Sequence, residues 1–429
     1  MSLLIRNTLA VLPDGNGHAV GRHDLYITGA DIAGIDEVPE GFAPDEIIDG
    51  TSFLTIPGLV NAHAHTYMCI MRNVADDLAL EGWLFGAVGP IEHRLEPEDS
   101  YWASLLSQAE MIRSGTTCFN DMQKHIGQAS RAVVESGMRA VVCRALAGND
   151  YDRDNRRIHE ALRERDEFSE CDRLSFCLGP HASYTCGPDF LRMVADVARE
   201  QGMGIHIHLA ESQGESVRVW ARHHLTPVEY VRDAGIFDVP TVAAHCTRVN
   251  DSDCAILAEC GVSVATCPAS NMKLGNGFAP VPELIKAGVN VCLGTDGAAS
   301  NNAQNMFREM GLLALIHKGT HDTPQCISAD EALDMATING ARALGLPCGS
   351  IEVGRKADIA LLDLDSPSLT PLNNPVAALA YSCNGSEVTD VIIDGAPVMR
   401  DRELLTIDED RVRAEIARIC KRLGIDTLD

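Results

Sequence analysis

Apolar and polar positions divide the chain into a long middle part and two flanks with a different pattern. From Ser2 to about Ile56, short apolar segments alternate with polar turns, and the same pattern returns near the other end in KADIALLDL, VTDVIIDGAPVM and RELLTI. Gly and Asp stand at the breaks, as turns require. The two flanks, residues 1–57 and 347–406, are therefore predicted to form one small β-sandwich domain.

The middle part, residues 58–346, alternates apolar strand candidates with longer amphipathic helices such as GPDFLRMVADVAREQ. The eight strand candidates are GLVNAHAH, TTCFND, RAVVCRA, LSFCLGPH, GIHIHLAE, TVAAHC, VSVATCP and VNVCLGTD. This alternation predicts an α/β fold, a (β/α)8 TIM-like barrel. An open doubly wound sheet that binds a dinucleotide is disfavoured, because no GxGxxG follows the first strand. Residues 407–429 have the pattern of an amphipathic helix packed on the outside.

The predicted strands end in side chains of the kinds that bind metals. His63 and His65 close the first strand and point to the same side, because strand side chains alternate. The chemistry of such barrels sits at the carboxyl ends of the strands. Later strands bring to this rim His181, His208, His245 and Asp296. A single buried histidine is usually a satisfied core residue, but six such side chains at one rim favour a shared metal site.

Two neighbours of His208 have different expected roles. His206 lies two residues earlier on the same face and one layer deeper, so it is expected to pack in the interior or to support the ligands from behind. Glu211 lies three residues later, off the strand end, where a general acid or base belongs. An isolated loop glutamate is normally solvated surface, but beside His208 a catalytic role is favoured.

The ligand types indicate which ion such a site prefers. Imidazole and carboxylate groups without thiolates suit a borderline divalent ion, with Zn2+ first and Fe2+ or Mn2+ as alternatives. A divalent ion of this kind makes a bound water acidic enough to supply hydroxide near neutral pH, which points to hydrolysis.

Composition narrows the possible partners. The chain of 429 residues is 45% hydrophobic, enough for a large core and more than one ordinary single-core domain needs. Its formal charge of -26 disfavours a nucleic-acid partner, because phosphate binding depends on clustered Lys and Arg. No apolar run reaches the roughly 18 residues of a membrane span, and the first residues lack a signal-peptide pattern, so a cytoplasmic location without membrane contact is expected.

The fifteen cysteines are an odd number and are scattered through apolar runs. A long chain of ordinary Cys density is unlike a secreted disulfide framework, so most of these residues are expected to be buried free thiols. There is no CxxC pair, which removes the usual thiolate zinc site.

Several segments together resemble a known family. PGLVNAHAH, DDLALEGWL, EMIRSGTT, PHASYTC, HLAES, CPASNMKLGNGFAPV and GTDGAASNN are similar to the amidohydrolase superfamily, in particular to its branch of 5'-methylthioadenosine/S-adenosylhomocysteine deaminases, over nearly the whole chain. The resemblance implies that a single metal ion is held by His63, His65, His208 and Asp296. It also implies that Glu211 carries a proton to a ring nitrogen, while His245 and Asp296 orient and deprotonate the attacking water.

The number of metal ions follows from a residue that the chain lacks. By the same resemblance, binuclear members bridge their ions with a modified lysine at the end of the fourth strand. The chain has six lysines, and none lies in or near LSFCLGPH. A mononuclear site is therefore expected, and the resemblance links such sites to deamination of aromatic rings.

The resemblance also implies substrate contacts. Glu92 aligns with a carboxylate that binds ribose hydroxyls, His181 with a substrate-contacting imidazole, and Arg144 with a substrate-binding arginine. Trp83 and Phe85 are candidates to wall the purine or its 5' substituent. The alternatives are a helix-surface acid for Glu92, a rim salt bridge for Arg144 and core packing for the aromatic residues. Without a P-loop or a dense basic cluster, a neutral adenine nucleoside such as adenosine, 5'-deoxyadenosine or methylthioadenosine is favoured over a nucleotide.

Two segments depart from the family pattern. Thr266 stands where relatives often have histidine, which affects pocket shape rather than metal binding. The loop 147–160 differs from the usual continuation, so affinity for the carboxylate tail of S-adenosylhomocysteine is not inferred.

The expected function is metal-dependent hydrolytic deamination of an adenine nucleoside by a homo-oligomer, the oligomer being expected by resemblance alone. Deaminases of guanine-like, pterin or cytosine rings and s-triazine hydrolases on the same scaffold stay open as alternatives. A non-catalytic, dihydropyrimidinase-like assembly protein is the alternative from another class.

Overall fold

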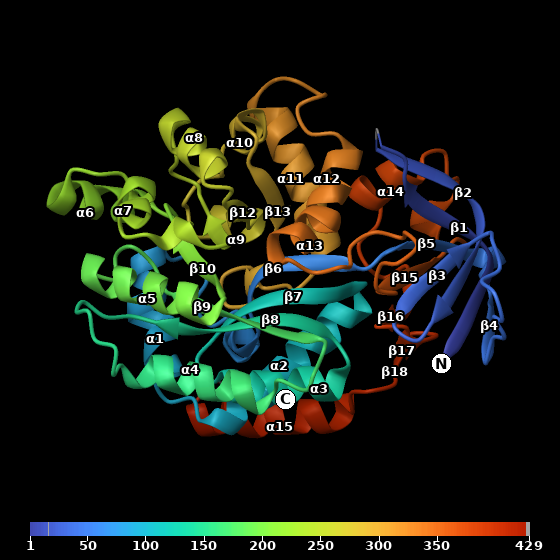
Figure 1. The fold of residues 1–429 in the computed structure, drawn as a ribbon, viewed down its shortest axis with the longest axis horizontal. Helices are drawn as coiled ribbons and strands as arrows, with labels where there is room; N and C mark the ends of the chain where they lie inside the picture. Colours follow the sequence, from blue (N-terminus) through green and yellow to red (C-terminus); the bar gives the residue numbers. More distant parts are fainter. Residues whose placement is uncertain (16, 426–429) are drawn as a thin grey trace.

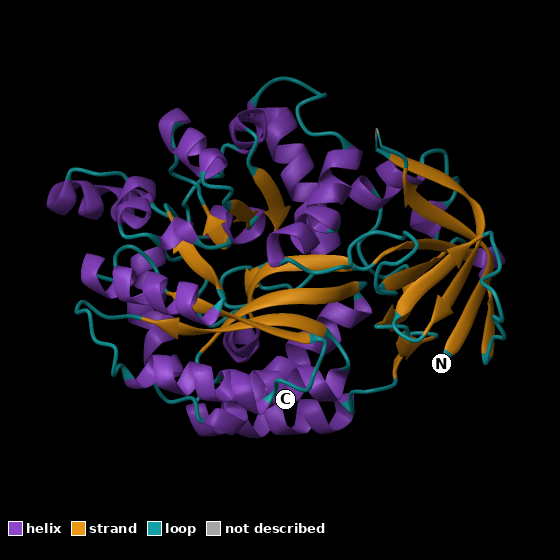
Figure 2. Cartoon of the chain, viewed as in Figure 1, coloured by secondary structure: helices purple, strands orange, loops and turns teal. Residues whose placement is uncertain are grey.

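The computed structural model describes residues 1–15 and 17–425 and contains two sheets of nine strands each (Figures 1 and 2). One sheet forms the centre of the larger part, and the other lies to its side and contains strands from both ends of the chain. The predicted C-terminal helix is observed as α15 (Glu409–Leu423), and residues 426–429 of that prediction lie outside the described residues.

The central sheet is parallel and curls into a barrel. Its strands are β6 (Leu59–His65), β7 (Thr116–Gln123), β8 (Arg139–Leu146), β9 (Leu174–Pro180), β10 (Gly204–Leu209), β11 (Thr241–His245), β12 (Ser263–Thr266), β13 (Asn290–Leu293) and β14 (Asp296–Gly297). β13 pairs with β12, and β14 pairs with β6. Because only Gly294 and Thr295 separate β13 from β14, one stretch of chain joins the last strand to the first and closes the ring. The expected α/β fold is confirmed, and the curled parallel sheet is consistent with the expected TIM-like barrel.

Helices surround the barrel and connect its strands (Figure 2). They are α2 (Pro97–Arg113), α3 (Ile126–Ser136), α4 (Arg156–Glu167), α5 (Pro188–Gln201), α6 (Gln213–His223), α7 (Pro227–Asp233), α8 (Asp251–Glu259), α9 (Pro268–Lys273), α10 (Val281–Ala287), α11 (Met306–Thr320), α12 (Ala329–Ala336) and α13 (Ile338–Leu344). After β6 come a 3₁₀ segment (Thr66–Met71), a π-helical segment η3 (Gly82–Val88) and α1 (Gly89–Glu92). No helix of the described residues is long and apolar enough to cross a membrane.

Local sequence explains where these helices begin and end. In α5, Pro188 occupies the first turn, where its missing N–H costs nothing, and Gly202 takes the left-handed conformation that ends the helix. Between them, Phe190, Val194 and Val197 form a buried stripe with helical spacing. In the same way, the apolar stripe of each helix packs against the barrel.

The second sheet is assembled from both flanks. Its strands are β1 (Ser2–Pro13), β2 (His18–Thr28), β3 (Asp31–Ile35), β4 (Glu46–Asp49), β5 (Phe53–Pro57), β15 (Ile359–Asp363), β16 (Val388–Ile393), β17 (Ala396–Arg400) and β18 (Glu403–Leu404), and helix α14 (Pro375–Tyr381) lies between β15 and β16. They form one hydrogen-bonded sheet in which β5 joins β1 to β15. The second sheet is therefore built from both terminal flanks, as predicted. The predicted sandwich of two packed sheets is not confirmed.

A buried ion pair attaches this second sheet to the barrel. Arg139, the first residue of β8, is 2% exposed and donates to Asp358 at 2.8 Å and to Asp394 at 2.7 Å. Both aspartates belong to the C-terminal flank. Because Arg139 starts its strand, the second sheet packs near the amino ends of the barrel strands and leaves the carboxyl ends free for a site.

The cysteines agree with the expectation of free thiols. All fifteen belong to the described residues and none is disulfide-bonded, and most are buried. They act as small apolar side chains of the core.

Candidate active site

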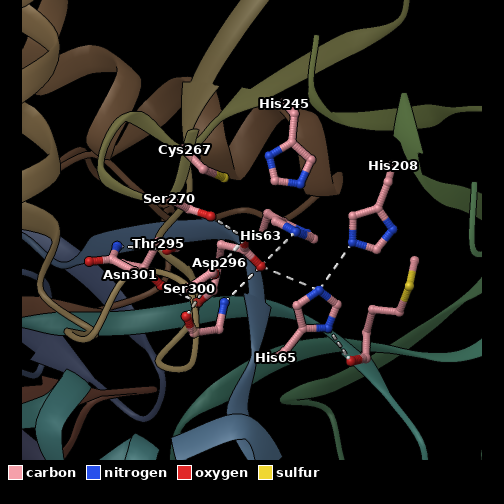
Figure 3. A network of polar contacts seen from close by, with 12 residues as sticks. His63, His65, His208, His245, Cys267, Ser270, Thr295, Asp296, Ser300 and Asn301 are labelled. Carbon is pink, nitrogen blue, oxygen red and sulfur yellow. Dashed lines mark hydrogen bonds and ion pairs between the residues drawn. The ribbon is translucent and has the colours of Figure 1, made fainter. Parts of the chain in front are cut away.

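The carboxyl ends of the barrel strands bring the predicted metal ligands to one point (Figure 3). Nε2 of His65 lies 3.1 Å from Nε2 of His208, although β6 and β10 are far apart in the chain. Oδ1 of Asp296 lies 3.4 Å from Nε2 of His63 and 3.4 Å from Nε2 of His65. The four side chains thus face a common centre, as the resemblance implied.

The outer nitrogens of these imidazoles already have partners. Nδ1 of His65 donates to the carbonyl oxygen of Met122 at 2.8 Å, and Nδ1 of His208 donates to that of His181 at 2.7 Å. A carbonyl accepts only, so the proton of each ring sits on Nδ1 and each Nε2 presents a lone pair. Two lone pairs 3.1 Å apart repel each other unless a cation lies between them.

His63 shows the same arrangement with a different outer partner. Its Nδ1 lies 2.8 Å from Nε2 of His206, one layer deeper in the barrel. Its Nε2 is buried and has no hydrogen-bond partner among the described residues. A buried nitrogen without a partner is costly, so it is expected to bind an ion. The prediction that His206 stands behind the ligands agrees with this position.

Asp296 is held so that one oxygen points to the centre. Ser270 donates to its Oδ2 at 2.6 Å and Ser300 at 2.9 Å, while the backbone N–H of Gly297 donates to Oδ1 at 2.7 Å. Burial alone would raise the pKa of Asp296, but its contacts with His63 and other imidazoles hold that pKa well below its usual range. The three hydrogen bonds donated to its oxygens also favour the ionised form, which a metal ligand requires.

His63 and His208 are held in the complementary neutral form. Burial lowers the pKa of His63 to about 3 and holds that of His208 well below its ordinary value. Neutral imidazoles with an ionised carboxylate are the donor set of zinc sites without thiolates. A tetrahedron with zinc bonds of about 2.0–2.1 Å has edges of about 3.3–3.4 Å, close to the 3.1 and 3.4 Å measured here between donor atoms. The residues present fit one divalent ion.

Glu211 and His245 stand beside this centre. Oε1 of Glu211 lies 3.9 Å from Nε2 of His245 and accepts a hydrogen bond from Nδ2 of Asn276 at 3.3 Å. Nδ1 of His245 contacts Oδ1 of Asn271 at 2.8 Å. Burial raises the pKa of Glu211 to about 7, which is where a proton-transfer group is most useful near neutral pH. The pKa of His245 is raised too, because the nearby Glu211 and Asp296 outweigh the effect of burial.

A pocket opens above the centre. Its walls are His65, Tyr67, Met68, Leu80, Trp83, Leu84, Glu92, Met122, Ala145, His181, Tyr184, His208, Glu211, His245 and Asp296. The expected substrate residues Glu92, His181 and Trp83 are therefore brought together with the ligands. Trp83 is 5% exposed and donates through Nε1 to the carbonyl oxygen of Ala299 at 3.1 Å, which fixes its indole.

Arg144 is the expected site residue that the structure places elsewhere. Its guanidinium donates to Glu164 on α4 at 2.5 Å and to the carbonyl oxygen of Lys124 at 2.9 Å. Side chains alternate along β8, so when Ala145 faces the pocket Arg144 points outward. The geometry is that of the rim salt bridge considered as the alternative, and a substrate contact by Arg144 remains untested.

Phe85 and Thr266 also differ from what was expected. Phe85 is 61% exposed and is absent from the described pocket wall, because η3 directs it outward while Trp83 points inward. Thr266 is buried at the end of β12 and does not reach that wall either.

Sequence reasoning missed the residues that surround the reactive groups. Tyr67 and Tyr184 line the pocket, Asn271 contacts His245 and Asn276 contacts Glu211. All four lie inside or directly beside the quoted motifs, as in HAHTYM, PHASYTC and CPASNMKLGNG, and this proximity was the available signal.

Arg157 on α4 lies outside the described pocket wall but near Glu92. Burial and the neighbouring Arg144 lower the pKa of Arg157, although the charge of Glu92 tends to raise it.

Comparison with known proteins bears on this site. The chain matches the model of the amidohydrolase family over residues 54–398. It is 46% identical to a 5-methylthioadenosine/S-adenosylhomocysteine deaminase of Acetivibrio thermocellus, over 99% of this chain and 100% of that protein. It is 43% identical to a 5'-deoxyadenosine deaminase of Methanocaldococcus jannaschii, over 91% and 94%. The crystal structure of an adenosine deaminase from Xanthomonas campestris with bound zinc has a TM-score of 0.93 at 32% identity and covers 99% of both chains.

Proposed function

The chain belongs to the amidohydrolase family, and on that basis we propose that it is a metal-dependent hydrolase that deaminates adenine nucleosides. The observation that carries this proposal is the convergence of Nε2 of His65, Nε2 of His208 and Oδ1 of Asp296 beside a glutamate with a pKa of about 7. Ligand geometry and an acid–base group are both required for this chemistry.

We assign the ion to His63, His65, His208 and Asp296, one ion per subunit, with Zn2+ preferred over Fe2+ and Mn2+. When bound, a divalent ion makes water acidic enough to act as hydroxide near neutral pH. Ser270 and Ser300 hold Oδ2 of Asp296 and so leave its Oδ1 directed at the centre.

The remaining steps belong to side chains. His245 and Asp296 orient the attacking water and take its proton, and Glu211 gives its own proton to the ring nitrogen next to the carbon under attack. The water oxygen forms a bond to that carbon. The new hydroxyl then returns a proton to Glu211, the amino group accepts the proton that the water lost, and the C–N bond breaks with release of ammonia.

The substrate that we propose is a neutral adenosine, 5'-deoxyadenosine, 5'-methylthioadenosine or S-adenosylhomocysteine. The relatives named for these substrates cover nearly the whole chain. Glu92 on the pocket wall is assigned to the ribose hydroxyls and His181 to the ring or ribose, with Trp83 as a wall. Arg144 is kept as a weaker candidate because it is engaged with α4.

The other readings have less support. Guanine-like, pterin, cytosine or s-triazine rings lack the ribose that Glu92 is assigned to bind. A non-catalytic assembly protein is expected to lose metal ligands, whereas all four assigned ligands face one centre here.

A panel of substrates tests the proposal. Adenine nucleosides that vary at the 5' position are compared with guanine, pterins and triazines by ammonia release from the metal-loaded protein. Release from at least one adenine nucleoside, and loss of that release in Glu211→Gln, is the expected result. Turnover of only the other rings, or undiminished turnover in Glu211→Gln, contradicts it.

The domain division and the partners of the molecule are also proposed. We propose a small β-sandwich of residues 1–57 and 347–406, a barrel of residues 58–346 and an outer helix within residues 407–429. The molecule is proposed to act as a homo-oligomer without nucleic-acid or membrane partners, by the resemblance and by the charge of -26.

A further inference from the structure

The segment SQGE, Ser212 to Glu215, has the sequence pattern of a helix capping box, but the structure completes only half of it. In a capping box the residue before the helix accepts the N–H of the fourth residue of the pattern, whose side chain reaches back to the first residue's N–H. Ser212 does accept the backbone N–H of Glu215 at 3.2 Å. The Glu215 carboxylate, however, bypasses Ser212 and accepts the backbone N–H of Glu211 at 2.8 Å.

Other helices of the same chain have complete capping boxes, so the incomplete box is a particular feature of α6. At α7, Thr226 and Glu229 form the complete reciprocal box, and at α12 Ser328 and Glu331 do so as well. Glu215 also differs from these acids in burial, because its side chain is 0% exposed. A fully buried carboxylate is costly unless its oxygens are hydrogen-bonded, so its contacts identify what it stabilises.

The first contact stabilises a strained turn in front of Glu211. Ala210 has a φ of 48°, a left-handed conformation that a residue with Cβ adopts at a cost. The backbone N–H of Ala210 lies near the Glu215 carboxylate, next to that of Glu211, which donates to it at 2.8 Å. Successive N–H groups in such a turn form a cradle for an anion. The oxygens of Glu215 fill that cradle from within the chain.

The second contact joins this turn to the opposite wall of the pocket. The hydroxyl of Ser183 donates to the other oxygen of Glu215 at 2.5 Å. Ser183 follows His181, whose carbonyl oxygen accepts hydrogen bonds from both the backbone N–H and Nδ1 of His208 at 3.0 and 2.7 Å. One carboxylate therefore ties the loop of His181 to the loop of Glu211.

We propose that Glu215 is a positioning residue that holds Glu211 and His181 at a fixed separation across the pocket. Glu211 is fixed on its other side by Thr247, whose hydroxyl donates to its carbonyl oxygen at 2.7 Å. Glu215 itself is absent from the described pocket wall and acts through the backbone of Glu211 and through Ser183. The inference rests on the proposed deaminase function and adds to it the means by which the acid–base group is aligned.

Substitutions at position 215 separate alignment from simple loss of a charge. In Glu215→Gln, the amide oxygen still accepts the N–H of Glu211, and the amide nitrogen donates to the Ser183 hydroxyl, which is able to accept. This variant keeps kcat within about threefold of the wild type. In Glu215→Ala both ties are lost, and kcat falls about 100-fold, as a displacement of about 1 Å at a reacting group produces.

A second substitution tests the role of the turn. Glycine adopts a positive φ without the Cβ penalty. Adding Ala210→Gly to Glu215→Ala therefore restores kcat by about fivefold to tenfold, because the turn no longer depends on the carboxylate. A role of Glu215 limited to overall stability predicts no such rescue.

The experiment combines kinetics with hydrogen exchange of the metal-loaded protein. The matched control is Glu229→Ala, which removes an acid from the same position of the next helix but from a complete capping box. Glu215→Ala, unlike Glu229→Ala, is expected to lower kcat and to speed amide exchange in the peptide that contains residues 209–213, with bound metal unchanged. Equal kcat and equal exchange in wild type and Glu215→Ala overturn the proposal.

A variant that does not fold, and a wrong deaminase proposal, can each be distinguished from a wrong proposal about Glu215. If Glu215→Ala does not fold, Ser183→Ala tests the same tie and is expected to raise KM by about threefold to tenfold with a smaller change in kcat, because His181 is the group released. Unchanged KM and kcat in Ser183→Ala overturn the proposal. If the wild type releases no ammonia from any nucleoside, the deaminase proposal is wrong, while amide exchange still decides whether Glu215 fixes the turn.

Discussion

Nε2 of His65 and Nε2 of His208 face each other at 3.1 Å, and the proton of each ring lies on the far nitrogen, where it is donated to a carbonyl oxygen. Two facing lone pairs in a buried site are stable only with a cation between them. We therefore propose that an ion is part of the folded structure, because metal binding stabilises the state that binds it.

Removal of the ion is therefore expected to lower both stability and activity. Treatment with a chelator abolishes ammonia release and lowers the melting temperature, and about one equivalent of Zn2+ restores both. The measurement is calorimetry and activity before and after restoration. A chelated protein with an unchanged melting temperature and full activity contradicts the assigned ligands.

Glu211→Gln tests the proton transfer. The amide is close to the carboxyl group in size but neither takes nor gives the proton, so kcat is expected to fall about 10²- to 10⁴-fold. Bound metal remains close to wild type, because Glu211 is not among the assigned metal ligands. Loss of metal together with activity points instead to a structural role.

The pH dependence of kcat/KM reports the state of Glu211. Its pKa of about 7 means that the protonated donor is present below pH 7 and is lost above it, so kcat/KM is expected to fall as pH rises through about 7. Asn276 donates to Glu211 and so favours the ionised form. In Asn276→Leu this hydrogen bond is gone, and the fall is expected to move to higher pH. A shift to lower pH contradicts the assignment.

His206 is expected to support metal affinity from behind His63. Its Nε2 lies 2.8 Å from Nδ1 of His63, and such outer partners commonly change metal affinity by 10- to 100-fold. His206→Leu is expected to weaken Zn2+ binding by about that factor in competition with a chromogenic chelator. His206→Gln, which is able to hydrogen-bond, loses less. Equal Zn2+ affinity in both variants and in the wild type contradicts this role of His206.

His18 is expected to make stability depend on pH at a site far from the metal. Its two ring nitrogens lie 3.1 Å from Asp330 and 3.3 Å from Asp334 of α12. Burial tends to lower the pKa of His18, but the two aspartates raise it overall. Because the folded-state pKa is raised, this stabilisation is complete below pH 6.5 and is lost as pH rises through the folded-state pKa.

The comparison with His18→Gln isolates this effect. The wild type is expected to melt on the order of 1–2 °C above the variant at pH 5.5, and the difference shrinks toward pH 9. The expected difference in melting temperature is small because both aspartates are partly exposed. A difference in melting temperature that grows as pH rises contradicts a raised folded-state pKa of His18.

The barrel and its ligand set could be predicted from sequence because both follow from short-range rules. Alternation along one strand places His63 and His65 on one side, and parallel strands bring their ends to one rim. The position of Arg144 could not be predicted in this way. Its side chain points outward from β8 because the neighbouring Ala145 faces the pocket. A single strand in isolation does not determine that choice.

The support of the reactive groups required the structure for a different reason. The pattern from Ser212 to Glu215 predicts a local capping box, but the carboxylate is taken by the turn at Glu211 and by Ser183, which lies 32 residues away. Phe85 is similar, since η3 is a π-helical segment whose faces differ from those of an α-helix. A contact distant in sequence decides the first case, and the backbone geometry of η3 decides the second.

The most direct test of the central claim is the metal content and position in the purified protein. Elemental analysis and anomalous diffraction are expected to find one divalent ion per chain within about 2.0–2.2 Å of His63, His65, His208 and Asp296, and to find it lost in His65→Gln. A metal-replete preparation with no ion among these four side chains, or with an ion bound elsewhere, contradicts the account.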